Sequence, residues 1–156
     1  MIEGLMSGRV YFLIRCVLAG VFLYAGAGKL LDAQGFATVI GGYGLLPDQL
    51  NLLAAYVLPL AEIVIALGLI WDVRGALSSY SVLLLVFMGV LAHGVNMGLD
   101  VDCGCFAPGD PEGEAYHSLR EALFRDALLL CGCGYLYLLR RVRGFRARPL
   151  LSFVSR

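Results

Sequence analysis

Apolar residues along the chain gather into four long segments, each of about 20 residues, that are separated by shorter connections with polar residues. A helix of about 20 residues rises about 30 Å, which matches the hydrocarbon thickness of a bilayer. Neighbouring segments joined by short connections should run antiparallel and pack into a bundle. We therefore predict an all-α, integral membrane four-helix bundle in one domain over residues 1–156. The predicted helices cover about residues 9–30, 50–71, 76–99 and 118–140, and a basic tail covers residues 140–156.

Local signals refine these boundaries. The glycine-rich connection after the first helix has room for a short interfacial helix near residues 36–40. Ser118 and Glu121 form a capping-box pattern, so the last helix should begin at Ser118. Gly94 and Gly98 are four residues apart, a spacing of small residues that permits close packing of two helices.

Composition agrees with a membrane protein, because 60% of the residues are hydrophobic and only 15% are charged. A soluble domain would carry about 25% charged residues. Ala25-Gly26-Ala27 resembles a signal-peptidase site. We interpret the first segment as a membrane helix instead, because it contains Arg15 and three more spans follow it.

Charge is distributed unevenly and predicts the orientation of the bundle. The segment from Arg140 to Arg156 contains six arginines and no acid, whereas the segment from Asp100 to Glu114 contains five acids and no base. The positive-inside rule places the arginine tail in the cytoplasm, and four spans then place the N-terminus there too. We expect a multi-pass protein of the bacterial inner membrane, whose acidic loop faces the periplasm. The tail is explained as a topology signal, so no nucleic-acid partner is expected.

The acidic loop contains Cys103 and Cys105, separated by Gly104. A disulfide between two such close cysteines is strained and easily reduced, which favours exchange chemistry over a structural bridge. The flanking acids Asp100 and Asp102 oppose this chemistry, because negative charge disfavours the reactive thiolate. A static disulfide and a soft-metal site remain alternatives, since two thiolates suit Cu(I), Zn(II) or Hg(II). We assign no residue to a metal site.

A second Cys-Gly-Cys, Cys131 to Cys133, falls inside the last predicted helix. Residues two apart do not share a helix face, so a bridge between them is not expected. By depth they match Cys16 of the first helix, and a buried group of three thiols is one possibility. The favoured interpretation is packing by small apolar residues.

Polar side chains are expected in the outer half of the bundle, below the cysteine loop. They are Lys29, Glu62, His93, Asn96, Arg125 and Asp126. Charged groups at membrane depth cost about 2.5–3.5 kcal/mol on insertion scales, so they usually face the interior and pair. Glu62 could pair with Arg125 or with Lys29, or it could remain protonated. One interpretation is a structural ion pair, and the other is a proton route or the polar end of a ligand pocket.

The chain resembles the small four-helix membrane proteins of the MauE type, methylamine-utilisation proteins related to the DoxX/DoxD group. The features that carry the resemblance are Ala27-Gly28-Lys29-Leu30, Pro59-x-x-Glu62, Asn96 with Asp102-Cys103-Gly104-Cys105-Phe106, and Arg125-Asp126. Ala107 stands where the family usually has glycine. The resemblance implies a redox-associated protein that works beside a periplasmic thioredoxin-like partner or a cysteine-rich client. Analogy with four-helix membrane enzymes that couple thiols to quinone makes quinone the candidate cofactor, although those enzymes generally carry Cys-x-x-Cys.

Our first hypothesis is a membrane thiol–disulfide oxidoreductase in which Cys103, Cys105, Lys29 and His93 act in catalysis. Glu62, Asn96, Arg125 and Asp126 would then line the site of the electron carrier. The second hypothesis is a protein that binds or transports a soft metal through both cysteine pairs. The third is a non-catalytic assembly subunit in the membrane.

Overall fold

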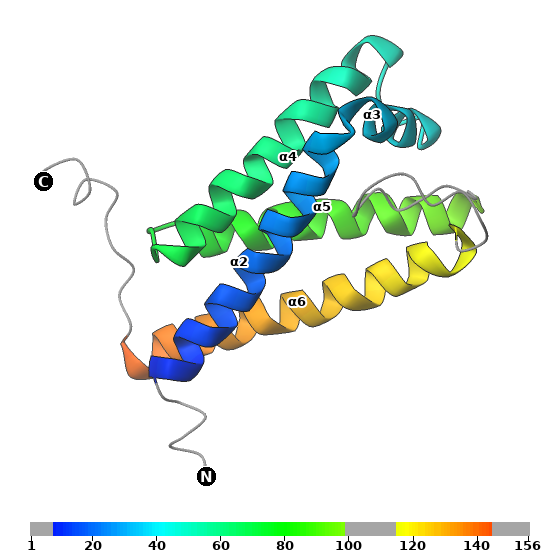
Figure 1. Ribbon diagram of the computed structural model, residues 1–156. Helices are drawn as coiled ribbons and strands as arrows, with labels where there is room; N and C mark the ends of the chain where they lie inside the picture. The colour runs from blue at the N-terminus through cyan, green and yellow to red at the C-terminus, as the bar shows by residue number, and fades with distance from the viewer. Residues whose placement is uncertain (1–7, 99–114, 145–156) are drawn as a thin grey trace, which may run out of the picture.

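The computed structural model describes residues 8–98 and 115–144, with side chains from residue 119 onward in the last helix. Within these ranges every regular element is a helix, which confirms the all-α prediction (Figure 1). The helices are α2 (Gly8–Leu31), α3 (Ala33–Gly42), α4 (Asp48–Ile70), α5 (Ala76–Met97) and α6 (Ala115–Arg143).

Four helices of the described chain, α2, α4, α5 and α6, are long and apolar enough to cross a membrane. Large apolar side chains on all four are exposed, among them Val17, Val64, Val82 and Leu128. Such a surface is costly in water but fits the hydrocarbon of a bilayer, where lipid covers it. The prediction of an integral membrane four-helix protein is therefore confirmed.

The observed helices differ from the predicted ranges by at most about three residues at each end. The expected short helix after the first span exists as α3, and Asp32 caps it by accepting a hydrogen bond of 2.9 Å from the Gly35 backbone N–H. The prediction that the last helix begins at Ser118 was wrong, because α6 begins at Ala115. Alanine is the best helix former, so the helix extends past the capping-box pattern.

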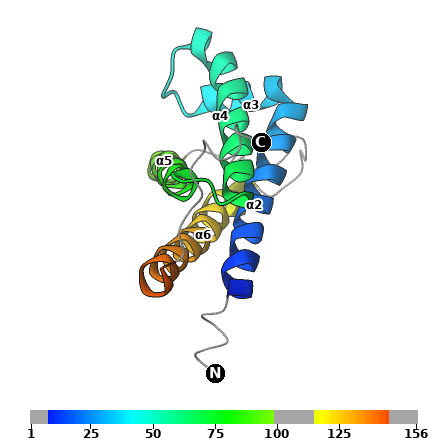
Figure 2. The ribbon, with the colours of Figure 1, turned by 90° about the vertical axis from the view of Figure 1, so that its left-hand side faces the viewer.

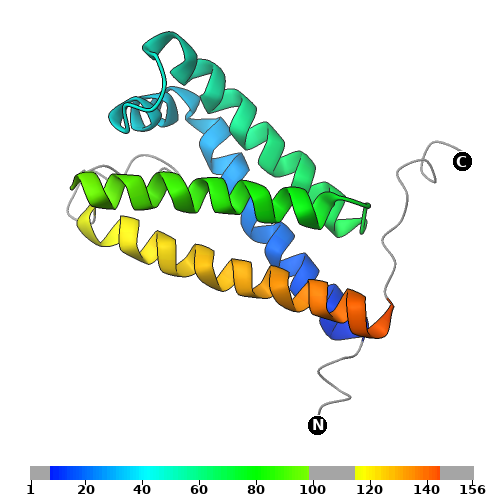
Figure 3. The ribbon, with the colours of Figure 1, turned by 180° about the vertical axis from the view of Figure 1, so that it is seen from behind.

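The helices define two ends of the molecule (Figures 1 and 3). At the turn end lie the start of α2, the 71–75 turn between α4 and α5, and the end of α6. At the loop end lie the end of α2, α3, the end of α5 and the start of α6. Helices α5 and α6 run side by side, whereas α4 and α5 meet at the turn end and diverge toward the loop end, as the view along α5 in Figure 2 also shows. The position of each end relative to the cytoplasm stays a prediction.

Helix α2 crosses α4 closely at Gly26. A Cβ atom at Gly26 would lie 3.0 Å from the carbonyl oxygen of Pro59 and 3.0 Å from Cγ1 of Ile63. Glycine therefore permits this close approach of the two helices, as small residues do in membrane bundles.

The expected small-residue face on α5 has a different use from the one predicted. Gly94 faces the ring of Tyr43, which follows α3, and a Cβ at Gly94 would lie 2.6 Å from Cε1 of that ring. Gly98 ends α5 with a φ of 64°, a left-handed conformation that glycine adopts readily. Gly94 thus accommodates an aromatic side chain, and Gly98 ends the helix.

An ion-pair network holds the turn end together. Asp72 contacts Arg15 of α2 and Arg140 of α6, each at 2.7 Å, and accepts a hydrogen bond of 2.9 Å from the Tyr11 hydroxyl. Asp72 has a φ of 57°, which aspartate tolerates better than most residues. The network joins α2 and α6 to the turn between α4 and α5.

Candidate functional site

Lys29 and Glu62 form an ion pair in the interior of the molecule, with 4% and 0% of their surfaces exposed. A Cβ atom at Gly26 would lie 3.3 Å from Cβ of Glu62, so Glu62 is part of the helix crossing, and Lys29 lies three residues, about one helical turn, further along α2. The crossing therefore brings the last turn of α2 and the middle of α4 together and points both side chains into the same space. Of the two partners that the sequence left open for Glu62, the structure selects Lys29.

Arg125 and Asp126 of α6 form a second ion pair beside the first. The Nε and Nη2 atoms of Arg125 donate hydrogen bonds of 3.2 and 3.0 Å to Oδ1 of Asp126. Asp126 is buried, whereas the Arg125 side chain is 31% exposed. This pair connects the interior with the surface of α6.

The two pairs surround one small void of about 20 Å³, which Phe22 and Phe87 also line. A void of this size can hold about one water molecule when polar groups surround it. We call Lys29, Glu62, Arg125 and Asp126 the charge cluster. Its two cations and two anions sum to zero formal charge, which is the arrangement that lowers the cost of burying ions at membrane depth.

One carboxylate oxygen of the charge cluster has no hydrogen-bond donor among the described residues. Oε2 of Glu62 is buried and makes no hydrogen bond within residues 8–98 and 115–144. A buried acceptor without a donor is costly, and such groups are concentrated at functional sites. The cluster therefore has unused capacity to hold a proton or a polar ligand atom.

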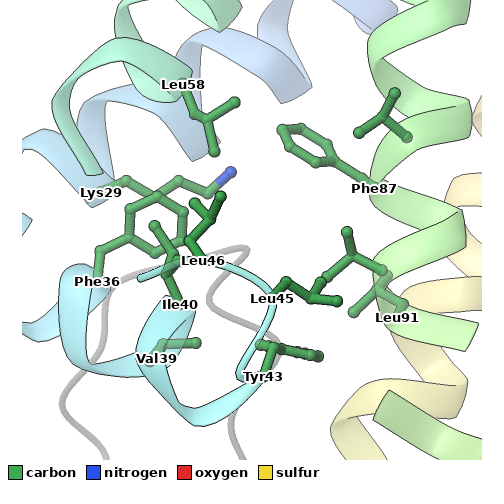
Figure 4. A pocket seen from close by; sticks show the side chains of 12 residues that line it. Lys29, Phe36, Val39, Ile40, Tyr43, Leu45, Leu46, Leu58, Phe87 and Leu91 are labelled. Atoms are coloured by element: carbon green, nitrogen blue, oxygen red, sulfur yellow. The ribbon is translucent and has the colours of Figure 1, made fainter. Parts of the chain in front are cut away.

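Lys29 also lines a second, larger cavity. The cavity has a volume of about 270 Å³ and is lined by apolar and aromatic residues from α3, α4, α5 and the 43–46 segment (Figure 4). The Nζ atom of Lys29 lies 4.8 Å from the ring centre of Phe87 and 5.3 Å from that of Phe36. Both rings stabilise the ammonium group through cation–π contacts. We call this space the α3 cavity.

His93 and Asn96 were expected beside Lys29 and Glu62, and this expectation was wrong. Both side chains are exposed, whereas Leu91 and Gly94 of the same helix are buried. Each residue advances about 100° around a helix, so His93 lies about 200° around α5 from Leu91. Sequence position put His93 near the end of α5 but did not show which face of the helix carries it.

Cys103 and Cys105 lie outside the described residues. The helices that flank their segment end at Met97 and begin at Ala115, both at the loop end. Among the other cysteines, Cys131 is exposed, Cys133 is buried and Cys16 is intermediate. No three potential metal ligands come together within the described ranges, so the three thiols do not form the deeper relay that the soft-metal hypothesis requires.

Comparison with known proteins places the chain in a family. The family model described as methylamine utilisation protein MauE matches residues 7–139. The chain belongs to the MauE family.

Two methylamine utilization proteins MauE are similar to this MauE-family chain. The protein from Paracoccus denitrificans is 35% identical over 134 residues, which cover 83% of this chain and 72% of the relative. The protein from Paracoccus versutus is 32% identical over 110 residues, which cover 69% of this chain and 59% of the relative. No solved structure matches the chain. Family membership and four apolar spans establish a multi-pass bacterial membrane protein.

The matched range includes the whole charge cluster and both cysteines of the loop. Sequence reasoning missed two features of this MauE-family fold. One is the role of α3, although Phe36, Ile40 and Tyr43 recur at the spacing of one helical face and could have indicated an inward side. The other is Asp72, because no local pattern links a turn residue to arginines on two distant helices.

Proposed function

We propose that this MauE-family protein acts in methylamine utilisation as a membrane thiol–disulfide redox protein. Cys103 and Cys105 exchange a disulfide with a periplasmic thioredoxin-like protein or a cysteine-rich client. Electrons then pass to a membrane quinone. Family membership and the names of the two relatives support the process, and the strained Cys-Gly-Cys spacing supports the chemistry.

One structural observation carries the proposal: the helix ends that flank the cysteine segment and the end of α2 that bears Lys29 all lie at the loop end. The segment with Cys103 and Cys105 leaves α5 and enters α6 at this end, and α2 brings Lys29 to the charge cluster from the same end. A dithiol and an apolar cavity with a charged group are the two parts that an electron-transferring thiol protein needs.

Exchange is tested with purified protein in nanodiscs, a reduced thioredoxin-like client and decylubiquinone. Client oxidation should proceed with the unaltered chain and stop in Cys103→Ser and in Cys105→Ser. A Cys131→Ser/Cys133→Ala double variant is the matched control and should retain the rate. Unchanged oxidation in both loop variants would rule out this chemistry.

Orientation is a separate part of the proposal. Three arginines lie in the last turn of α6, and by the positive-inside rule they support a turn end that faces the cytoplasm. In intact cells treated with a mild reductant, a membrane-impermeant maleimide should label Cys103 and Cys105. A cysteine introduced by Arg74→Cys, at an exposed position of the turn end, should be labelled only after permeabilisation. The reverse labelling pattern would overturn the orientation.

The soft-metal hypothesis receives no comparable support. It requires the deeper cysteines to act together, and Cys131 and Cys133 point to differently exposed sides of α6. The redox hypothesis requires only the loop pair.

A further inference from the structure

The α3 cavity combines an apolar wall with one charged group. Lys29 is the only charged residue that lines it in the described chain, and the remaining lining consists of apolar and aromatic side chains. Ligand sites commonly have this character, with a few polar groups that orient an otherwise apolar molecule. The volume of about 270 Å³ approaches the lower end of the usual range for such sites, about 300 Å³.

Lys29 has hydrogen-bonding capacity to spare toward this cavity. An ammonium group carries three N–H donors, and the hydrogen bond to Oε1 of Glu62 uses one of them. The rings of Phe36 and Phe87 lie beside the same nitrogen but accept only weak contacts. Figure 4 shows the nitrogen reaching from α2 into the space near Leu58 and Phe87. A ligand with an acceptor oxygen would satisfy a donor that is otherwise buried among apolar groups.

Charge balance determines what kind of oxygen fits. Glu62 already neutralises Lys29, so an anionic ligand would leave a net negative charge in an apolar environment, which is costly. A neutral carbonyl oxygen accepts the hydrogen bond without adding charge. The faces and edges of Phe36 and Phe87 favour a planar ring beside that carbonyl.

The cavity is also placed for a ligand that is dissolved in the bilayer. Leu45, Leu46 and Val86 line it and are exposed at the surface of the described chain. Residues of the membrane-spanning helices α4 and α5 both line it, and these two helices diverge toward the loop end (Figure 3). A lipid-soluble molecule can therefore enter from the side without crossing water.

We propose that the α3 cavity binds a neutral, lipid-soluble carbonyl ring of the quinone class, whose oxygen accepts a hydrogen bond from Nζ of Lys29. The proposal rests on the proposed function, because this molecule is the electron carrier for the loop cysteines. Oxidation of Cys103 and Cys105 to a disulfide releases two electrons and two protons. Reduction of the two carbonyls to hydroxyls consumes both electrons and both protons, so the step balances. Asn96 does not line this cavity, and Arg125 and Asp126 line the smaller void instead.

Binding is tested without turnover in the Cys103→Ser/Cys105→Ser protein in nanodiscs. An azidoquinone probe is crosslinked by light, its site is mapped by mass spectrometry, and decylubiquinone is the competitor. Crosslinks should fall on peptides of α3, α4 and α5 that line the cavity. Leu58→Trp on α4 and Val90→Trp on α5 fill the cavity from two helices and should each weaken decylubiquinone binding about tenfold or more. The matched controls Leu60→Trp and Leu85→Trp, at exposed positions of α4 and α5 that do not line the cavity, should leave binding unchanged.

Equal binding in the fillers and the controls would overturn the assignment of the cavity. Competition by dodecanoate as strong as that by decylubiquinone would show that the cavity takes a carboxylate, which contradicts the charge argument. A single transfer of a disulfide from the loop to reduced client needs no carrier. If the loop transfers its disulfide to the client but the azidoquinone probe does not bind, the quinone site in the α3 cavity is refuted and the proposed function is not. If the probe binds but no disulfide is transferred, the proposed function is refuted.

Discussion

Lys29 and Glu62 neutralise each other inside the bundle, at the point where Gly26 lets α2 cross α4 closely. The crossing and the ion pair depend on each other. Close approach places the two charges together, and their attraction favours the same register of the two helices.

Replacing one member of this pair should destabilise the protein strongly. Glu62→Gln leaves the Lys29 ammonium buried without its counter-ion, and breaking a buried pair in this way costs about 3–5 kcal/mol. The double variant Lys29→Met/Glu62→Leu removes both charges and should recover most of that loss. The free energy of unfolding, from titration with SDS followed by circular dichroism, measures both effects. Glu121→Gln at an exposed position of α6 is the control, and a Glu62→Gln protein as stable as this control would contradict the account.

Asp72 should stabilise the turn end through its charge. Asp72→Asn keeps a side chain that tolerates the positive φ but removes the partner of Arg15 and Arg140. Hydrogen bonds to charged groups contribute about 1.5–3 kcal/mol each, and we expect a loss in this range. The same unfolding measurement tests it, with Arg74→Gln on the same turn as a neutral control. No difference between the two variants would show that the network contributes nothing.

Gly94 should tolerate a methyl group far less well than Gly89, although both lie on α5. Alanine at position 94 would press on the Tyr43 ring, whereas nothing lies within 4 Å of a Cβ at position 89. Overpacking typically costs about 1–3 kcal/mol. Gly89→Ala should be neutral or stabilising by up to about 1 kcal/mol, because alanine favours the helix. Thermal melting of both variants in the same detergent decides the matter, and equal melting temperatures would mean that Tyr43 does not pack on Gly94.

The cysteines of α6 should be dispensable for redox activity. Cys131 is exposed and Cys133 packs in the core, so Cys131→Ser should be silent. Cys133→Ala should lower stability modestly without changing disulfide exchange by more than about twofold. If the reduced protein bound metal stoichiometrically and the Cys131→Ser/Cys133→Ala double variant did not, the soft-metal hypothesis would be favoured instead.

Sequence alone predicted the four spans and α3, because the length of an apolar run and the spacing of glycines are local properties. It did not decide the ion-pair partner of Glu62, because Arg125 and Lys29 were both expected in the same half of the bundle. The crossing at Gly26, which brings Lys29 to Glu62, is visible only in the structure. It placed His93 on the wrong side of α5, since a uniformly apolar membrane helix shows little difference between its lipid-facing and protein-facing sides. Only the packed structure shows that the face of α5 with Leu84 and Leu91 is the buried one.

The α3 cavity and the Asp72 network were beyond sequence reasoning for a different reason. Each joins residues from three or more segments that are far apart in the chain. A pattern in one segment predicts the segment's own shape but not the contacts that it makes across the bundle.

The central claim is that Cys103 and Cys105 pass electrons to a membrane carrier. The most direct test is their redox state in native membranes, measured by alkylation with a mass-tagged maleimide in a Cys16→Ala/Cys131→Ser/Cys133→Ala background, with and without added quinone. The account predicts a dithiol that becomes a disulfide when quinone is supplied, and less so when Leu58→Trp fills the α3 cavity. A pair that stays reduced whatever the quinone state, but is protected from alkylation by Cu(I) or Hg(II), would contradict it.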